Sequence, residues 1–238
     1  MTIRSSNAFV IKKENIDEND RLYTFYTEDF GKLNLIAKGA QKTKAKLSGH
    51  LEIPSYVWIK FSLGQKDRLI SALEKEPFLE IKHNFWALEF SFEILKFLDA
   101  FTPFYQKDTN LWFLLFETFF YLKENLNRGK FILDFFSLYF KSRVLFFSGW
   151  APYLDGCLFC NQEAHYFSFD QKGLVCKQHR KGEEIFLTKR EIEFLKDLFC
   201  GDIKNFFKIS LIKEILKSKD KFNLILKKFA FSLGFDII

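Results

Sequence analysis

The first third of the chain alternates apolar and polar residues over short runs, which is the pattern of strands with one buried face. Polar residues and glycines separate the runs, as in the turns between strands. The five runs cover residues 9–11, 22–26, 32–37, 56–61 and 69–73. Five short strands suit a small barrel of the OB or SH3-like kind, because closure removes exposed sheet edges. We therefore expect a five-stranded OB-like β-barrel domain over residues 1–78.

Beyond Pro77 the apolar residues recur at intervals of three and four, which is the spacing of one helix face. Such runs cover residues 85–98, 111–122 and 131–146. Other phenylalanines fall on the remaining faces of these helices, so the helices need cover on several sides, as in a bundle. Thr188 and Glu191 have the spacing of a capping box, and amphipathic runs follow at residues 211–216 and 222–233. The pattern predicts an α+β chain with a helical domain over residues 79–238.

The composition adds a high aromatic content, with 33 Phe, 8 Tyr and 4 Trp among 238 residues. Since such rings are mostly buried in folded proteins, phenylalanine is first of all a core residue here. The most apolar stretch, residues 111–122, contains Glu117 and is shorter than the roughly 20 apolar residues that span a bilayer. The first residues lack the apolar segment of a secretory signal. We expect a cytoplasmic protein without a membrane partner.

Three of the four cysteines lie close together in the sequence. Two residues separate Cys157 from Cys160, and two separate Cys176 from His179. This gap lets paired ligands turn toward one ion at about 2.3 Å, and the spacing is typical of a structural zinc site. Residues 166–175 predict a hairpin between the two pairs. We expect a zinc-ribbon insert at residues 155–182 that holds one structural Zn²⁺ per chain.

Alternatives to this ligand set remain open. Cys200 and His165 could replace His179 as the fourth ligand, and three unligated thiols are the alternative to a metal site. A site closed by four protein ligands has no open position, so its ion would not activate water. The sequence has no phosphate-binding glycine loop, nucleophile elbow or metalloprotease helix motif. It therefore favours a binding protein over an enzyme, with no catalytic residues.

Positive charge is concentrated after the third predicted strand. The chain has a formal net charge of +6, and residues 38–46 contain four lysines and no acidic residue. Such a loop stays exposed, and its lysines could contact nucleic-acid phosphates in a salt-sensitive manner. A solvated loop without a partner is the alternative. We predict DNA-backbone contacts at Lys38, Lys42, Lys44, Lys46, Arg4 and Lys12.

Two parts of the sequence resemble the RecO family of bacterial recombination mediators. Residues 25–32, followed by residues 37–42, are similar to a Thr, Gly-Lys and Ala-Lys-Gly-Ala pattern in the OB domain of that family. Residues 173–176 match the pattern at the second half of the family's zinc site. The approach to its first half is matched at Arg143, Val144, Leu145, Gly149, Pro152, Leu154, Cys157 and Cys160.

The resemblance implies a non-enzymatic DNA repair protein that binds single- and double-stranded DNA and anneals complementary strands at the nucleoid. It implies cooperation with RecR and contact with the acidic C-terminal tail of single-stranded DNA-binding protein (SSB). Through this contact the protein would help RecA to replace SSB on DNA. A basic, apolar groove in the helical region would take that tail, and the cations there are Arg128, Lys130 and Arg143. We expect a monomer. A zinc-ribbon adaptor that binds only proteins, without annealing activity, is the alternative.

Overall fold

The structure is a computed structural model that describes residues 2–40, 51–202 and 216–235. The chain divides into two compact units, residues 1–133 and residues 134–238. This division falls in the first turn of helix α4 (Phe131–Phe147). The change from strands to helices lies near residue 78, between strand β5 (Arg68–Glu76) and helix α1 (Leu79–Lys82). A domain boundary at that point stays a prediction.

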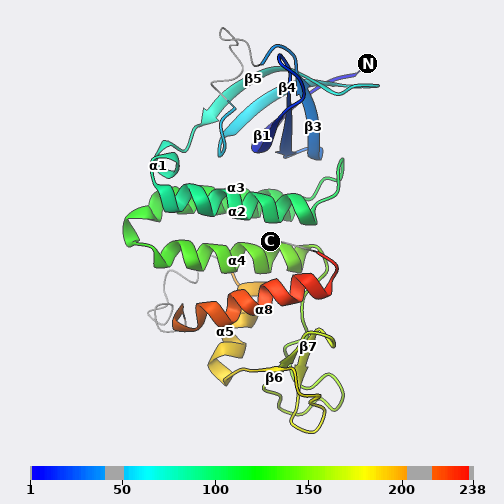
Figure 1. Cartoon of the computed structure of the whole chain (residues 1–238), viewed down its shortest axis with the longest axis vertical. Coiled ribbons are helices and arrows are strands. Elements are labelled where there is room, and N and C mark those ends of the chain that lie inside the picture. Colours follow the sequence, from blue (N-terminus) through cyan, green and yellow to red (C-terminus); the bar gives the residue numbers. More distant parts are fainter. Residues whose placement is uncertain (1, 41–50, 203–215, 236–238) are drawn as a thin grey trace. The chain divides into compact units, whose positions relative to one another are not determined.

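The first unit begins with a five-stranded sheet (Figure 1). Its strands are β1 (Thr2–Asn15), β2 (Arg21–Thr27), β3 (Gly31–Ala37), β4 (Tyr56–Leu63) and β5 (Arg68–Glu76). The strand order is β1-β2-β3-β5-β4, and β4 also pairs with β1 along its whole length. Neighbouring strands are antiparallel except β3 and β5, where Ile36 faces Arg68 in parallel. The five predicted strands are confirmed.

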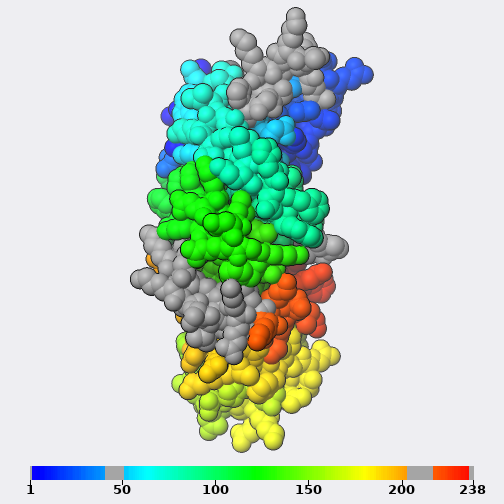
Figure 2. Space-filling model, turned by 90° about the vertical axis from the view of Figure 1, so that its left-hand side faces the viewer, coloured from blue at the N-terminus to red at the C-terminus, as the bar shows by residue number. Residues whose placement is uncertain are grey.

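Two long helices follow in the same unit, α2 (Phe85–Phe101) and α3 (Thr109–Asn125), and the short turn η2 (Leu126–Arg128) leads to α4. The Asn84 side chain caps α2 by accepting a hydrogen bond from the Ala87 N–H at 3.1 Å. The Asp108 carboxylate caps α3 in the same way. Such caps supply acceptors to first-turn N–H groups that have no partner inside the helix. The strands and these helices form a continuous surface in Figure 2.

One aromatic core joins the sheet to α3. The Phe9 side chain on β1 is fully buried, and its ring centroid lies 5.5 Å from those of Trp112 and Phe119. Phe78, which precedes α1, packs against the same Phe119 ring at 5.3 Å. Buried rings remove a large apolar area from water and gain from tilted or offset contacts. The prediction that phenylalanine serves mainly in the core is confirmed at these positions.

A buried lysine connects the sheet to the end of α2 and the loop that follows it. Lys32 on β3 is only 5% exposed. Its Nζ atom donates to the Asp99 carbonyl at 2.6 Å and to the Asp99 carboxylate at 2.9 Å. The same ammonium lies 4.4 Å from the centroid of the Phe104 ring, and the Tyr105 N–H donates to the Lys32 carbonyl at 2.9 Å. Since a buried charge is costly unless it is paired, these contacts stabilise Lys32 in the interior.

Gly31 lets this loop approach the sheet closely. Its φ angle is +66°, in the left-handed region. A Cβ atom at this position would lie 1.9 Å from the Gln106 carbonyl oxygen. Only glycine fits both the backbone conformation and the contact.

We expect Asp99→Ala to lower the free energy of unfolding by about 1–3 kcal/mol, because the buried Lys32 ammonium loses its carboxylate partner. Lys107→Ala is the matched control. Lys107 and Asp29 form an ion pair at 3.5 Å in which both side chains are half exposed, and such pairs contribute about 0–1 kcal/mol. Urea denaturation measures both variants. Equally small losses would contradict a stabilising role for the Lys32 pair.

The second unit packs α8 (Lys219–Ser232) against α4 and α5 (Lys189–Cys200). Lys219 forms an ion pair with Asp134 of α4 at 3.0 Å, and Lys221 forms one with Glu191 of α5 at 2.7 Å. The capping box predicted from Thr188 and Glu191 is present at the start of α5. In the predicted run 211–216, residues 211–215 lie outside the described residues, and the turn η3 (Leu216–Ser218) precedes α8.

The insert between α4 and α5 forms a three-stranded antiparallel sheet. Its strands are β6 (Tyr166–Ser168), β7 (Gly173–Val175) and β8 (Ile185–Phe186), in the order β7-β6-β8. The predicted hairpin of this region is confirmed by the pairing of β6 with β7. Within the described ranges, none of the helices has the length and apolar content that a membrane span requires.

Candidate metal centre and nucleic-acid interface

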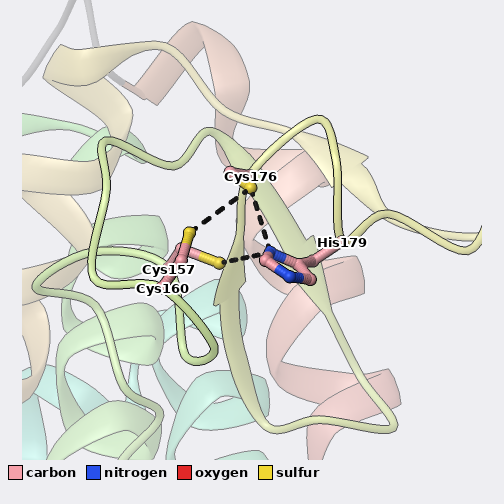
Figure 3. A group of neighbouring side chains, drawn as sticks. All are labelled: Cys157, Cys160, Cys176 and His179. Carbon is pink, nitrogen blue, oxygen red and sulfur yellow. Dashed lines mark hydrogen bonds between the residues drawn. The ribbon is translucent and has the colours of Figure 1, made fainter.

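Four side chains that can bind a metal converge beside the sheet of the insert (Figure 3). The ligand atoms of Cys157, Cys160, Cys176 and His179 all lie within 4.8 Å of one another. The Sγ atoms of Cys160 and Cys176 are 3.8 Å apart. The Nδ1 atom of His179 lies 3.5 Å from the Sγ atom of Cys157 and 3.2 Å from that of Cys176. The structure thus brings together the four residues that the spacing singles out.

Two tight turns position these ligands. In the first turn, the Asn161 N–H donates to the Cys157 carbonyl at 2.8 Å. In the second turn, the His179 N–H donates to the Cys176 carbonyl at 3.1 Å. The Leu158 N–H also donates to a carbonyl of β7 at 3.0 Å, so the first turn is attached to the strand that leads into the second. The backbone therefore holds the two ligand pairs face to face.

The local hydrogen bonds favour negative charge on two of the thiols. Burial raises the pKa of the Cys157 thiol, but N–H groups of Phe159, Cys176 and Cys160 outweigh it and lower that pKa to about 6. Burial likewise opposes ionisation of Cys176, and the N–H of His179 reverses this, so its pKa is lowered. The hydrogen bond to Cys176 raises the pKa of His179. Thiolates are the form of cysteine that binds metals, so the cluster attracts a cation.

Three of the distances between the ligand atoms are close to those of a tetrahedral centre, and all four atoms lie within 4.8 Å of one another. Four ligands at about 2.0–2.3 Å from one ion lie about 3.3–3.8 Å from each other, as in structural zinc sites. The measured separations of 3.2, 3.5 and 3.8 Å are close to this range. The cluster could therefore hold a metal ion with all four positions filled by the protein.

The two alternative ligands lie elsewhere. The Nδ1 atom of His165 is 2.9 Å from the Leu187 carbonyl, and its Nε2 atom is 3.4 Å from the Glu163 carboxylate. Cys200 is exposed at the end of α5. Neither belongs to the cluster, so His179 is the residue placed to complete it.

The predicted DNA-binding cations are only partly described. Lys42, Lys44 and Lys46 lie outside the described residues, whereas Lys38 is exposed in the turn after β3. Arg4 is exposed on β1, and Lys12 on the same strand forms an ion pair with Glu14 at 3.0 Å. A role of these residues in DNA binding stays a prediction.

The cations predicted for the partner tail lie in different surroundings. Arg128 and Lys130 are exposed in the first unit, and the Lys130 ammonium lies 3.8 Å from the centroid of the Trp86 ring. Arg143 belongs to the second unit, where its guanidinium donates to the Phe199 carbonyl and lies 4.4 Å from the Phe147 ring. The Arg143 guanidinium therefore makes its contacts within its own unit.

Side chains around the metal ligands carry further features that the spacing of the ligands does not predict. Phe159, between Cys157 and Cys160, is 54% exposed, and its ring centroid lies 5.1 Å from that of His179. Residues 171–182 also contain four cations and no acidic residue, but cysteine and histidine separate these cations, so they do not form a lysine run like that of residues 38–46.

The fold and the cluster define a mixed α+β protein in which an N-terminal sheet is followed by helices that carry a metal-binding insert. Sequence models of two domains match this chain. The model of the N-terminal domain of recombination protein O covers residues 1–77, and that of its C-terminal domain covers residues 92–222.

Curated relatives extend over most of the chain. A DNA repair protein RecO from Dehalococcoides mccartyi is 27% identical over 217 residues, which are 89% of this chain and 84% of the relative. DNA repair proteins RecO from Thermodesulfovibrio yellowstonii and Alkaliphilus metalliredigens are each 26% identical, over 92% and 94% of this chain and 89% and 91% of the relatives. The chain belongs to the RecO family, whose members are DNA repair mediators and not catalytic enzymes. The resemblance found in the sequence is confirmed.

We expect Cys157→Ser to lose the bound metal and to lower the melting temperature by about 5–10 °C, since each kcal/mol shifts it by about 2–4 °C in a chain of this size. Cys200→Ser is the matched control and should keep about one metal ion per chain. Elemental analysis and calorimetry measure these effects. Loss of metal in the Cys200 variant, or its retention in the Cys157 variant, would disprove this ligand assignment.

Proposed function

We propose that this chain is a recombination mediator that binds single- and double-stranded DNA, anneals complementary strands, and assists RecA in replacing SSB. The observation that carries the proposal is the match of both RecO domain models, over residues 1–77 and 92–222. We further propose that the protein acts as a monomer at the nucleoid and cooperates with RecR. Its five-stranded sheet would be an OB-like barrel, a fold that commonly binds oligonucleotides.

The proposed mechanism is electrostatic. Two complementary strands repel each other because both carry a negative charge at every phosphate. A cationic surface that neutralises both strands lowers the cost of their encounter, and it needs neither a covalent step nor a nucleotide cofactor. Residues 38–46, with four lysines and no acid, are the proposed surface, and Arg4 and Lys12 extend it.

The metal proposed for the insert is Zn²⁺. Three thiolates and one imidazole are a common donor set of structural zinc sites, and three of the distances between ligand atoms, 3.2, 3.5 and 3.8 Å, are close to those of its tetrahedral geometry. With four protein ligands the ion would have no place for a substrate or a reactive water. Its proposed role is to hold the two ligand turns together.

The SSB tail is proposed to bind near Trp86. Phe85 and Trp86 at the start of α2 are 71% and 50% exposed, and Lys130 lies over the Trp86 ring. An acidic peptide with apolar side chains would find cations and exposed rings here, with Arg128 close by in the sequence. Arg143 stays a prediction for this role.

We expect the combined substitution of Lys38, Lys42, Lys44 and Lys46 by Ala to slow strand annealing by about tenfold or more. Each lost phosphate contact removes a counterion-release contribution, so the slope of log affinity against log salt should fall by about 0.7 per lysine on single strands. Fluorescence annealing and anisotropy titrations measure the two quantities.

The control for this variant removes the same number of charges from the second unit, at Lys189, Arg190, Lys217 and Lys227. Equal annealing and an equal salt slope in the loop variant and the wild type would disprove the role of the loop. If the wild type binds no oligonucleotide even at low salt, where phosphate contacts are strongest, the protein-binding adaptor becomes the better description.

We expect Lys130→Glu to weaken binding of an SSB-tail peptide by about tenfold, because a carboxylate would replace the ammonium opposite an acidic ligand. Lys66→Glu, an equally exposed position in the turn between β4 and β5, is the matched control and should bind normally. Calorimetric titration gives both dissociation constants. Unchanged binding by the Lys130 variant would place the tail elsewhere.

A further inference from the structure

Cations and rings that are exposed or partly exposed lie in the insert that carries the metal cluster. We call Phe159, Tyr166, Lys177, Arg180, Lys181 and Phe186 the knuckle face. The Phe159 ring lies beside the ligand His179, which is followed directly by Arg180. The Arg180 guanidinium lies 4.8 Å from the centroid of the Tyr166 ring, and that ring lies 5.6 Å from Phe186. Ring contacts on the two sides of the His179–Arg180 peptide therefore link the first ligand turn to β8.

Two rings of the knuckle face are exposed, whereas many phenylalanines of the described residues, such as Phe9, Phe119 and Phe136, are fully buried. Phe159 is 54% exposed and Phe186 is 52% exposed. Backbone hydrogen bonds hold the Cys157–Cys160 turn, and the Phe159 ring at its tip contacts the His179 ring on one side while more than half of it stays exposed. An exposed ring with a free face is a platform on which a nucleic-acid base can stack.

The cations of the knuckle face are available to a ligand. Lys177 and Lys181 are exposed, and no acidic partner is found for their side chains among the described residues. Two carboxylates follow Lys181 in the sequence: Glu183 is exposed, whereas the side chain of Glu184 is only 4% exposed and pairs with Arg180 at 3.7 Å. Burial raises the pKa of Glu184, and the N–H groups of Lys181 and Gly182 outweigh this, so its pKa is lowered and its charge is satisfied inside the fold.

Two exposed acidic side chains, Glu163 and Glu183, limit the extent of this surface. Glu163 is 77% exposed and lies 3.4 Å from His165, whose ring stacks on Phe186 at 5.8 Å. Phosphates are therefore expected near Lys177 and Lys181, and the Phe186 end is expected to contact a base and not the backbone.

We propose that the knuckle face is a second DNA contact, specific for single strands, in which Phe159 and Phe186 stack on bases and Lys177 and Lys181 contact phosphates. Single strands are favoured over duplex because the base faces of a duplex are already stacked on each other. This inference rests on the proposed DNA-binding function, but it assigns a contact to residues of the second unit, in addition to the lysine-rich segment 38–46 of the first. The metal would then organise a binding surface as well as the backbone.

The first test is photocrosslinking of the full-length, metal-loaded chain to oligothymidylate that carries 5-iododeoxyuridine, with mass spectrometry to locate the adduct. We expect adducts on Phe159 or Phe186, both in the wild type and in the variant that lacks the four loop lysines. Adducts confined to the first unit would overturn the knuckle face while leaving the proposed function intact. A wild type that binds and anneals no DNA would overturn both.

The second test compares affinities. The double variant Phe159→Ala/Phe186→Ala should bind oligothymidylate about fivefold or more weakly and bind duplex DNA unchanged. Phe231→Ala, an exposed phenylalanine of α8, is the matched control. Metal content and melting temperature confirm that the variants are folded. An equal loss for single strands and duplex, or no loss, would contradict base stacking.

The charges are tested separately. Lys177→Ala/Lys181→Ala should reduce the salt slope on single strands by about 0.7 for each lysine, whereas the control Lys217→Ala/Lys227→Ala should leave it unchanged. An unchanged slope in the first variant would exclude phosphate contacts at these lysines.

Discussion

The first unit depends on the packing of rings from the sheet against rings from α3. Phe9 lies between the strands and the Trp112 and Phe119 rings, and Phe78 closes the same cluster where the strands end. Neither the sheet nor the helix could bury these surfaces alone. The pairing of the buried Lys32 with Asp99 depends on this arrangement. An ammonium group can be buried at low cost only where acceptors such as the Asp99 carboxylate and carbonyl replace its bonds to water.

Periodicity was a sound guide to the local elements. The five strands, the hairpin of the insert and the capping box of α5 each depend on residues that are close together in the sequence, so the local pattern predicts them. The burial of Lys32 could not be predicted in this way. A lysine in an alternating strand suggests a solvent-facing position, and the partner that reverses this, Asp99, lies 67 residues further along the chain.

The metal cluster, like the strands, was predictable from local sequence, because paired ligands at short spacing make local turns. The use of individual cations was not. Arg143 occupies a position that matches the family pattern, yet its guanidinium bonds to the end of α5. Phe159 is of a residue type that is often buried, and its exposure depends on its place in the Cys157–Cys160 turn, which only the structure shows. Whether a charge or a ring faces water depends on contacts distant in sequence.

The shared core has a consequence for synthesis on the ribosome. The match to the N-terminal RecO domain ends at residue 77, but the rings and the carboxylate that complete its interior come from α2 and α3, up to Phe119. A nascent chain that has just emerged through its fifth strand still lacks them. Its apolar faces would stay open until some forty further residues have left the exit tunnel, at a rate of about 5–20 residues per second. During those seconds the incomplete sheet exposes apolar surface that a chaperone could bind.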